Sequence, residues 1–338
     1  MDMRAVGVRS FGDPGSLELM SVGAPRPEPG EVLVKLSYSG INFIDVYMRN
    51  GTYAKSDTYK TPLPMILGME GSGIVAEIGD GVTGLQAGDR VAYCIHRGSY
   101  SEYAVVPAWK LVSVPDDIPL DVATALQLQG CTAHYLTHSA FDLGPGQTCL
   151  AHAGAGGVGQ LLIQLAKAKG ATVIATVGSV EKAEIARSRG ADHTILYRQE
   201  DFQARIMEIT DGAGVDVVYD SVGIDTVQRS LRSLKRRGLC VLFGGSSGTV
   251  EAISPLELAE AGSVFFTRPH LADYLQTAEE ISGRISALFD AYRSKQLIVT
   301  IDRIFPLAEA GTAHEVLEGR GTRGKLLLAV DEEMPISV

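Results

Sequence analysis

The pattern of apolar and polar residues divides this chain into two parts of different texture. In the first part, residues 31–41 alternate as a half-buried strand does, and residues 71–82 and 88–94 are further strands bounded by Gly-Asp turns. These short strands and turns predict a compact, mostly β, barrel-like domain over residues 1–125.

From about residue 126, apolar runs typical of strands alternate with amphipathic runs typical of helices. This alternation predicts an α/β fold with a doubly wound parallel sheet. The predicted strands are residues 148–152, 172–176, 193–196, 215–219, 239–243 and 263–266. The predicted helices are residues 180–189, 201–210, 226–235 and 271–294.

The last part of the chain contains predicted elements that lie outside the alternating strand and helix pattern of the second domain. From residue 297 onward, a turn at Pro306 precedes a predicted helix near 308–317 and an apolar run at 325–330. That run is a predicted strand without a partner of its own, so we expect it to pair with the first domain. The predicted domains are therefore residues 1–125 with 297–338, and residues 126–296.

A glycine cluster follows the first strand of the predicted parallel sheet. Residues 149–159 read CLAHAGAGGVG, which places Gly154, Gly156 and Gly159 in GxGxxG register before a helical apolar pattern. A lone GxGxxG could be an ordinary turn, but a strand before it and a helix after it favour a dinucleotide site. The glycines allow a tight turn and close approach of backbone to a pyrophosphate at the helix N-terminus.

The end of the second strand indicates which dinucleotide is bound. Enzymes that bind NAD carry an acidic residue there, which holds the ribose 2′-hydroxyl. In this chain that position is Val177, and Gly178, Ser179 and Lys182 follow it, with Glu181 as the first carboxylate. A 2′-phosphate needs donors and a cation, so the pattern predicts NADPH. The alternative for Lys182 is an ordinary solvated lysine.

Composition narrows the class of protein. The chain has 338 residues, 45% hydrophobic and 21% charged, as is typical of a globular protein. It has no apolar run long enough to cross a membrane and no signal-like apolar N-terminus, so we expect a cytoplasmic protein without membrane contact. The formal net charge of −10 makes nucleic acid an unlikely partner. The four cysteines form no CxxC pair.

Several motifs together identify a family. They are GAGGVG after an apolar strand, VYDSVG at 218–223, FGGSSG at 243–248, TRP at 267–269 and GINFIDVYMRNGTY at 40–53. In this order and over essentially the whole chain, they resemble the zinc-free, zeta-crystallin-like quinone oxidoreductases of the medium-chain dehydrogenase/reductase superfamily. The resemblance implies a Rossmann domain for NADPH and a GroES-like barrel domain, with the reaction in a cleft between the domains.

The residues themselves also indicate a site without metal. Zinc-dependent relatives carry a cysteine ligand in a GxCxxD segment and a histidine ligand in GHE. This chain has Asn42 at the first position and Met69 at the second, which removes two of the three protein ligands that catalytic zinc needs. Without a Lewis acid, oxidation of a simple alcohol loses its usual activation. Reduction of a conjugated acceptor remains feasible.

The resemblance also implies roles for individual residues. Asn42, Tyr47 and Tyr53 are the expected catalytic positions, with either tyrosine or water protonating the reduced oxygen. The positions implied around the cofactor are Asn42, Asp45, Tyr47 and Thr132 near the nicotinamide and its ribose, Gly154, Gly156, Gly157, Val158 and Gly159 at the pyrophosphate, Gly178, Ser179, Lys182 and Tyr197 at the 2′-phosphate, Ser221, Phe243, Gly245 and Ser246 along the dinucleotide, Phe266, Thr267 and Arg268 at the carboxamide, and Arg320 at a cofactor phosphate. Gln129 and Gly245 depart from residues common in relatives.

The expected function is NADPH-dependent reduction of a quinone by hydride transfer, in a homodimer paired through the edge strand at 263–267. Two alternatives remain open. One is a reductase of activated C=C bonds in a 2-alkenal, an enone or an enoyl thioester. The other is a non-catalytic, crystallin-like protein that binds NADPH or RNA.

Overall fold

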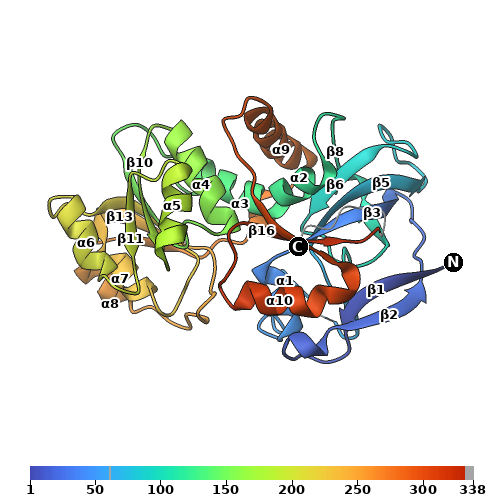
Figure 1. The fold of residues 1–338 in the computed structure, drawn as a ribbon, viewed down its shortest axis with the longest axis horizontal. Helices are drawn as coiled ribbons and strands as arrows, with labels where there is room; N and C mark the ends of the chain where they lie inside the picture. The colour runs from blue at the N-terminus through green and yellow to red at the C-terminus, as the bar shows by residue number, and fades with distance from the viewer. Residues whose placement is uncertain (61, 332–338) are drawn as a thin grey trace. The chain divides into compact units, whose positions relative to one another are not determined.

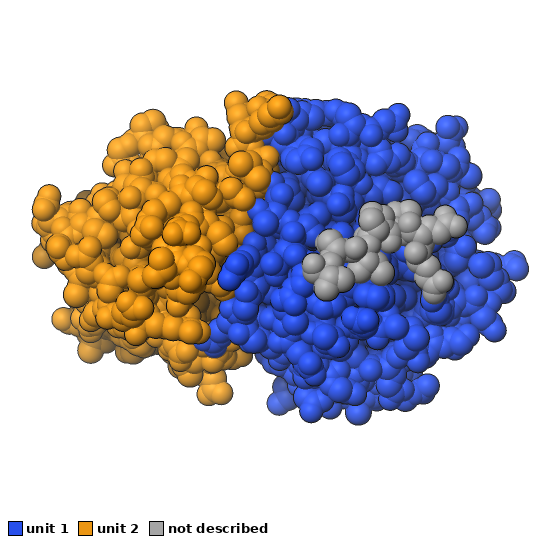
Figure 2. All heavy atoms as spheres, in the orientation of Figure 1, with its two compact units in different colours: residues 1–128, 275–293, 299–338 blue, residues 129–274, 294–298 orange. Residues whose placement is uncertain are grey.

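The computed structural model describes residues 1–60 and 62–331, which form two compact units (Figure 2). Unit 1 contains residues 1–128, 275–293 and the described residues from 299 onward, and unit 2 contains residues 129–274 and 294–298. Figure 1 labels the helices and strands of both. None of the described helices is long and apolar enough to cross a membrane.

Unit 2 is built on a six-stranded parallel sheet with the order β11-β10-β9-β12-β13-β14. Its strands are β9 (Thr148–Ala151), β10 (Thr172–Val177), β11 (His193–Leu196), β12 (Val215–Asp220), β13 (Leu234–Leu242) and β14 (Phe265–Thr267). In chain order this is strand 3, 2, 1, 4, 5, 6, the doubly wound arrangement of Rossmann folds. The predicted fold class is confirmed.

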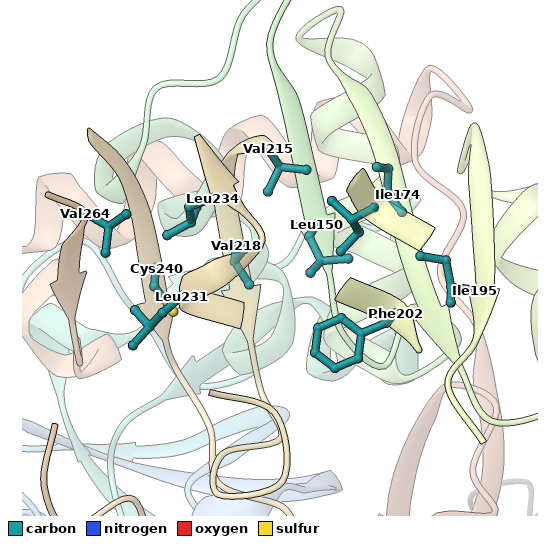
Figure 3. Close-up of a cluster of buried hydrophobic side chains, with 11 residues drawn as sticks. Leu150, Ile174, Ile195, Phe202, Val215, Val218, Leu231, Leu234, Cys240 and Val264 are labelled. Atoms are coloured by element: carbon teal, nitrogen blue, oxygen red, sulfur yellow. The ribbon is translucent and has the colours of Figure 1, made fainter. Parts of the chain in front are cut away.

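Helices cover this sheet and bury its apolar side chains. They include α4 (Gly157–Ala168), α5 (Val180–Ser188), α6 (Phe202–Ile209), α7 (Val227–Arg232) and α8 (Pro255–Glu260). Figure 3 shows Leu150, Ile174 and Val218 on neighbouring strands, with Phe202 and Leu231 from α6 and α7 packed against them. Because strands of a parallel sheet are covered by helices, they read as nearly continuous apolar runs in the sequence.

Unit 1 contains a seven-stranded and a three-stranded sheet. The larger has the order β15-β16-β3-β5-β6-β8, with β7 also paired to β3, and the smaller has the order β2-β1-β4. Their bounds are β1 (Asp2–Val8), β2 (Glu18–Gly23), β3 (Glu31–Ile41), β4 (Met65–Ile66), β5 (Glu70–Ile78), β6 (Arg90–Cys94), β7 (Tyr103–Pro107), β8 (Val112–Ser113), β15 (Ile301–Pro306) and β16 (Lys325–Ala329).

The C-terminal apolar run finds its partner in unit 1, as predicted. Strand β16 pairs antiparallel with β3 and parallel with β15. Leu327 and Ala329 of β16 pack with Tyr38 of β3 and Ile304 of β15 in a buried cluster. Helices α1 (Phe43–Arg49), α2 (Leu120–Ala125) and α10 (Ala310–Glu318) also belong to this unit.

The predicted helix at 271–294 differs from the observed structure in two respects. It is divided into a 3₁₀ turn at Leu271–Tyr274 and α9 (Ala278–Arg293). Helix α9 packs against β8, and Arg293 forms an ion pair with Asp117 at 2.7 Å, so residues 275–293 group with unit 1 rather than with the second domain. An amphipathic pattern predicts a helix, but it carries no information about which core the apolar side covers.

The residues before β9 and the start of β13 are helical and extended, respectively, where the sequence pattern predicted no element or a different one. After α2, the chain continues through π-helical turns and α3 (Cys131–Tyr135). Strand β13 begins at Leu234, which the sequence pattern had placed within a helix ending at residue 235.

Candidate functional site

The glycine cluster forms a tight turn between β9 and α4. Ala153 adopts a left-handed φ of 55°, and the Gly154 N–H donates to the Thr176 carbonyl of β10 at 3.0 Å. A Cβ on Gly154 would lie 2.8 Å from the Ala175 side chain, and one on Gly159 would lie 2.9 Å from Gly154 Cα. Both glycines are therefore required by close packing of the turn, sheet and helix.

The start of α4 remains open to a ligand. Gly156 caps the helix with extended backbone, and Gly156, Gly157 and Val158 keep part of their surface exposed. The N–H groups in the first turn of a helix have no partner within it and attract anions. The Gln129 side chain lies directly against Gly157, where a Cβ would be 2.6 Å from Nε2. This arrangement fits a pyrophosphate with a polar side chain beside it.

A second group of predicted residues comes together at the ends of β10 and β11. Ser179 caps α5 by accepting from the Lys182 backbone N–H at 3.3 Å, which places Lys182 in the first turn. Strands β10 and β11 are parallel neighbours, so Tyr197 follows β11 beside Gly178. A Cβ on Gly178 would lie 3.2 Å from the Tyr197 hydroxyl. The structure thus gathers four residues predicted to contact the 2′-phosphate.

Sequence reasoning missed Arg198 in this group. Its Nε would be 3.6 Å from a Cβ on Gly178, so the guanidinium lies at the same strand end. Arg198 is exposed and follows Tyr197 directly. Its position next to a predicted 2′-phosphate residue was the available signal. A guanidinium suits a phosphate because its planar donors match the phosphate oxygens.

The other predicted residues of unit 2 occupy neighbouring loops and the sheet edge. Ser221 follows β12, and its carbonyl accepts from the Ser246 N–H at 3.2 Å, which brings Ser221 together with the run from Phe243 to Ser246. Phe266 packs partly against the core cluster, whereas Arg268 is exposed. Thr132 lies in α3 and is 7% exposed. Contacts of these residues with a cofactor remain predictions.

Asn42 in unit 1 belongs to a buried polar cluster. Its Nδ2 donates to Glu70 Oε1 at 2.9 Å, and its Oδ1 accepts from Lys325 Nζ at 2.7 Å. Lys325 also forms an ion pair with Glu70, whose Oε2 accepts from the Leu128 N–H at 2.7 Å. Glu70 and Lys325 are at most 1% exposed. The Asn42 side chain is therefore held by two ionic partners, which gives it a structural role in addition to the predicted catalytic one.

A hydrogen-bond chain leads away from Asp45 on the inner face of α1. Asp45 Oδ2 accepts from the Asn42 N–H at 2.9 Å and from the Tyr100 hydroxyl at 3.4 Å. Tyr100 contacts His314 Nε2 at 3.0 Å, and His314 Nδ1 contacts Arg49 at 3.1 Å. Arginine can only donate, so Nδ1 accepts and the proton lies on Nε2. Arg49 therefore donates to His314, His314 donates to Tyr100, and Tyr100 donates to Asp45.

Burial is the main cause of the pKa shifts of the carboxyl and the imidazole in this row of hydrogen bonds. Desolvation raises the pKa of Asp45 to about 7, although the Asn42 N–H and the charge of Lys325 oppose the shift. Desolvation and the nearby Arg49 lower the pKa of His314 to about 3, so its imidazole is neutral. Asp45 Oδ1 is buried and has no hydrogen-bond partner among the described residues. The Asp45 carboxyl therefore changes its protonation state near neutral pH.

Four aromatic rings form a row on the opposite face of α1 and in the segment that follows. The ring centroids of Phe43 and Tyr47 are 6.0 Å apart, those of Tyr47 and Tyr53 are 5.3 Å apart, and those of Tyr53 and Tyr59 are 5.3 Å apart. Tyr47 and Tyr53 are half-buried. Offset and edge-to-face packing of this kind can accept another flat ring. The structure thus brings the two predicted tyrosines together.

Arg320 lies just beyond α10 and is exposed, with a left-handed φ of 56°. Its contact with a cofactor phosphate stays a prediction.

The parallel-sheet unit with its glycine turn and the β-rich unit together define a medium-chain dehydrogenase or reductase. Two family models match accordingly: the alcohol dehydrogenase GroES-like domain over residues 28–116, and the zinc-binding dehydrogenase over residues 157–282. The chain belongs to the quinone oxidoreductase family of this superfamily, which confirms the resemblance recognised from the motifs.

Individual relatives are similar over nearly their full length. Quinone oxidoreductase 1 of Escherichia coli is 42% identical over 320 residues, covering 94% of this chain and 96% of the relative. The 2-haloacrylate reductase of a Burkholderia species is 41% identical over 332 residues, covering 97% and 99%. The crystal structure of Escherichia coli quinone oxidoreductase complexed with NADPH has a TM-score of 0.93 at 41% identity, covering 96% and 99%.

The residues of this chain do not fit the zinc that one family description implies. Asn42 and Met69 stand at the positions of the cysteine and histidine ligands, and Met69 is buried with an exposure of 4%. The neighbouring Glu70 is engaged by the Lys325 ammonium, which also occupies the Asn42 oxygen. Among residues 1–60 and 62–331, no group of three or more His, Cys, Asp or Glu side chains could hold a metal ion. A fixed ammonium at this place would repel a divalent cation.

Replacing Asp45 with asparagine should change how stability depends on pH. The pKa of Asp45 is about 7 in the folded protein, above its value of about 3.9 in unfolded chains. Its contribution is therefore fully present below about pH 4 and is lost as pH rises through about 7. We expect the melting temperature of the parent to fall over this range, and that of Asp45→Asn to fall much less.

The matched control is Glu77→Gln, which removes an exposed carboxylate from the same unit and should follow the parent curve. A constant difference in melting temperature between the parent and Asp45→Asn, from about pH 5 to about pH 9, would show that Asp45 does not ionise in this range.

Proposed function

We propose that this chain reduces quinones with NADPH and without a metal. The observation that carries the proposal is the Lys325–Glu70–Asn42 cluster, which replaces a metal site with a buried ammonium. A site that lacks a Lewis acid suits an acceptor that is already electrophilic, and a conjugated quinone is one. Relatives at 41–42% identity named quinone oxidoreductase support this substrate class.

In the proposed reaction, the residues of unit 2 bind and orient the cofactor. The helix N-terminus at Gly156, with the N–H groups of Gly157 and Val158, would hold the pyrophosphate, and the strand end with Lys182 and Arg198 would hold the 2′-phosphate. Bound NADPH supplies the hydride. The contribution of the protein is positioning rather than covalent chemistry.

The residues of unit 1 would receive the acceptor. The row of rings that includes Tyr47 and Tyr53 offers ring faces on which a flat quinone stacks. After hydride transfer, the reduced oxygen takes a proton from one of these tyrosines or from water, which completes the hydroquinone. Asp45 faces Tyr100 instead, so its carboxyl supports the fold of α1 rather than this step.

One relative favours a second candidate substrate. The 2-haloacrylate reductase covers almost the entire chain, and its name describes reduction at an activated C=C bond. Such a bond is also electrophilic without a metal. The same cofactor site and the same aromatic row would serve this reaction.

We also propose that the chain acts as a homodimer in the cytoplasm. Strand β14 lies at the edge of the parallel sheet, and Phe265 on it is 62% exposed, as expected for a strand that pairs with a second copy. The cysteines at positions 94, 131, 149 and 240 are all free and buried, which is usual in a reducing compartment.

The substrate proposal is tested by following NADPH oxidation with two panels of acceptors. We expect turnover with benzoquinone and phenanthrenequinone to exceed that with crotonaldehyde, 2-chloroacrylate and an enoyl thioester by about tenfold or more in kcat/KM. A reversed order would establish the C=C reductase instead. NADPH binding without turnover of any acceptor would favour the non-catalytic alternative.

The two cations near the 2′-phosphate should determine the choice of cofactor. Because hydrogen bonds to a charged group contribute about 1.5–3 kcal/mol, Lys182→Ala and Arg198→Ala should each raise the KM for NADPH by about tenfold or more. The KM for NADH should change by less than about twofold. Arg187→Ala, which removes an exposed arginine from the last turn of α5, is the control. Equal losses for both cofactors would exclude a phosphate role.

Dimerisation through β14 is tested with Phe265→Glu and sedimentation. A charge on the edge strand should convert the dimer to a monomer. Leu256→Glu is the matched control because Leu256 is 68% exposed but lies in helix α8 and not on the edge strand. If both variants remain dimeric, another surface forms the contact.

A further inference from the structure

A buried polar network lies beneath the glycine turn and has no role so far. His152 directly follows β9 and is 3% exposed. Its Nδ1 is 2.8 Å from the Thr176 hydroxyl of β10, and its Nε2 is 3.0 Å from the Ser230 hydroxyl of α7. Ser230 donates to Asp220 Oδ2 at the end of β12 at 2.8 Å. Four side chains thus connect three neighbouring strand ends and one helix.

The Asp220 end fixes the direction of two of the contacts in this network. Asp220 accepts from two backbone N–H groups, at Val222 and Gly223, and from the Thr226 hydroxyl, so it acts as a carboxylate acceptor. The Ser230 hydroxyl has one proton, which it donates to Asp220. Its oxygen must therefore accept the hydrogen bond from His152 Nε2–H.

The remaining contact is then determined by the charge of His152. Burial lowers the pKa of His152, with a further lowering by Arg229 that the negative charge of Asp220 opposes. The imidazole is therefore neutral, and Nδ1 accepts from the Thr176 hydroxyl. The order Thr176 to His152 to Ser230 to Asp220 runs in a single direction, with each group as donor to the next.

The network supports two loops at once. His152 immediately precedes Ala153 and Gly154, whose N–H bonds the Thr176 carbonyl at 3.0 Å. Asp220 holds the turn at Val222 and Gly223, and the Val222 carbonyl accepts from the Ser247 N–H at 2.8 Å. The first loop begins α4, and the second meets the run from Phe243 to Ser246. Both loops carry residues expected to bind the dinucleotide.

We propose that His152 is a positioning residue, which couples these two loops through one fixed tautomer and sets their geometry for the dinucleotide. The inference rests on the proposed function, since it takes NADPH as the occupant. His152 does not itself contact the cofactor; it acts through the strand ends. A displacement of about 1 Å in a binding group can change rates or affinities by a large factor.

The first test compares two isosteric variants that each remove a hydroxyl from unit 2. Thr176→Val breaks the contact with His152, whereas Thr210→Val removes a hydroxyl that bonds Ile206 and Gly214 at the end of α6. We expect Thr176→Val to raise the Kd for NADPH by about tenfold and Thr210→Val by less than about twofold. In the ligand-free protein, amide exchange at Gly154–Gly157 should quicken only in Thr176→Val.

The second test reads the tautomer directly. Asp220→Asn keeps every contact but places an amide donor toward Ser230, which reverses the chain and moves the imidazole proton to Nδ1. Nitrogen NMR of labelled histidine should report protonation of Nε2 in the parent and of Nδ1 in Asp220→Asn. The His152 signal is assigned by its loss in His152→Asn.

The outcomes separate the two proposals. Equal changes in Kd for the two threonine variants, unchanged exchange at the glycine turn, or a parent tautomer protonated on Nδ1 would each overturn the positioning role. A parent protein that binds no NADPH would overturn the proposed function instead. In that case amide exchange and nitrogen NMR still decide whether the network fixes the conformation of the two loops, because neither measurement needs the cofactor.

Discussion

Leaving a polar group buried without a partner costs free energy, and this cost shapes both units. In unit 2, the parallel strands end together at one edge, where His152, Thr176 and Asp220 are almost fully buried. In unit 1, Lys325 and Glu70 are buried beside Asn42. An unpaired charge in either place would cost several kcal/mol, because removing one partner of a buried pair typically costs about 3–5 kcal/mol. The partners therefore fix the local backbone at both candidate sites.

Residues with a single hydrogen-bonding role give these networks their direction. Arg49 can only donate, so the chain through His314 and Tyr100 ends on Asp45. Asp220 only accepts, so the chain through Ser230 and His152 begins at Thr176. Each histidine is neutral because burial lowers its pKa, and each carries its proton on Nε2. A fixed proton order leaves one favoured arrangement of the surrounding loops.

The position of the buried Lys325 ammonium depends on the fold of unit 1, and it determines which kind of substrate the site suits. Lys325 comes from β16, which joins the larger sheet from the far end of the chain, and it reaches Asn42 and Glu70 only because β16 pairs with β3. A cation at this place satisfies the carboxylate and leaves no donor set for zinc. The activation of the substrate must then reside in the substrate itself, as it does in a conjugated acceptor.

The sequence by itself determined the parallel sheet, the glycine turn and the absence of an acid at Val177, because these depend on local periodicity and residue type. It also predicted that the strand at 325–330 joins the first domain. Only the tertiary structure decided that α9 packs in unit 1, that Arg198 lies beside Gly178, and that Lys325 pairs with Glu70. Contacts between residues distant in the sequence depend on which surfaces meet in the fold, and apolar periodicity does not encode that choice.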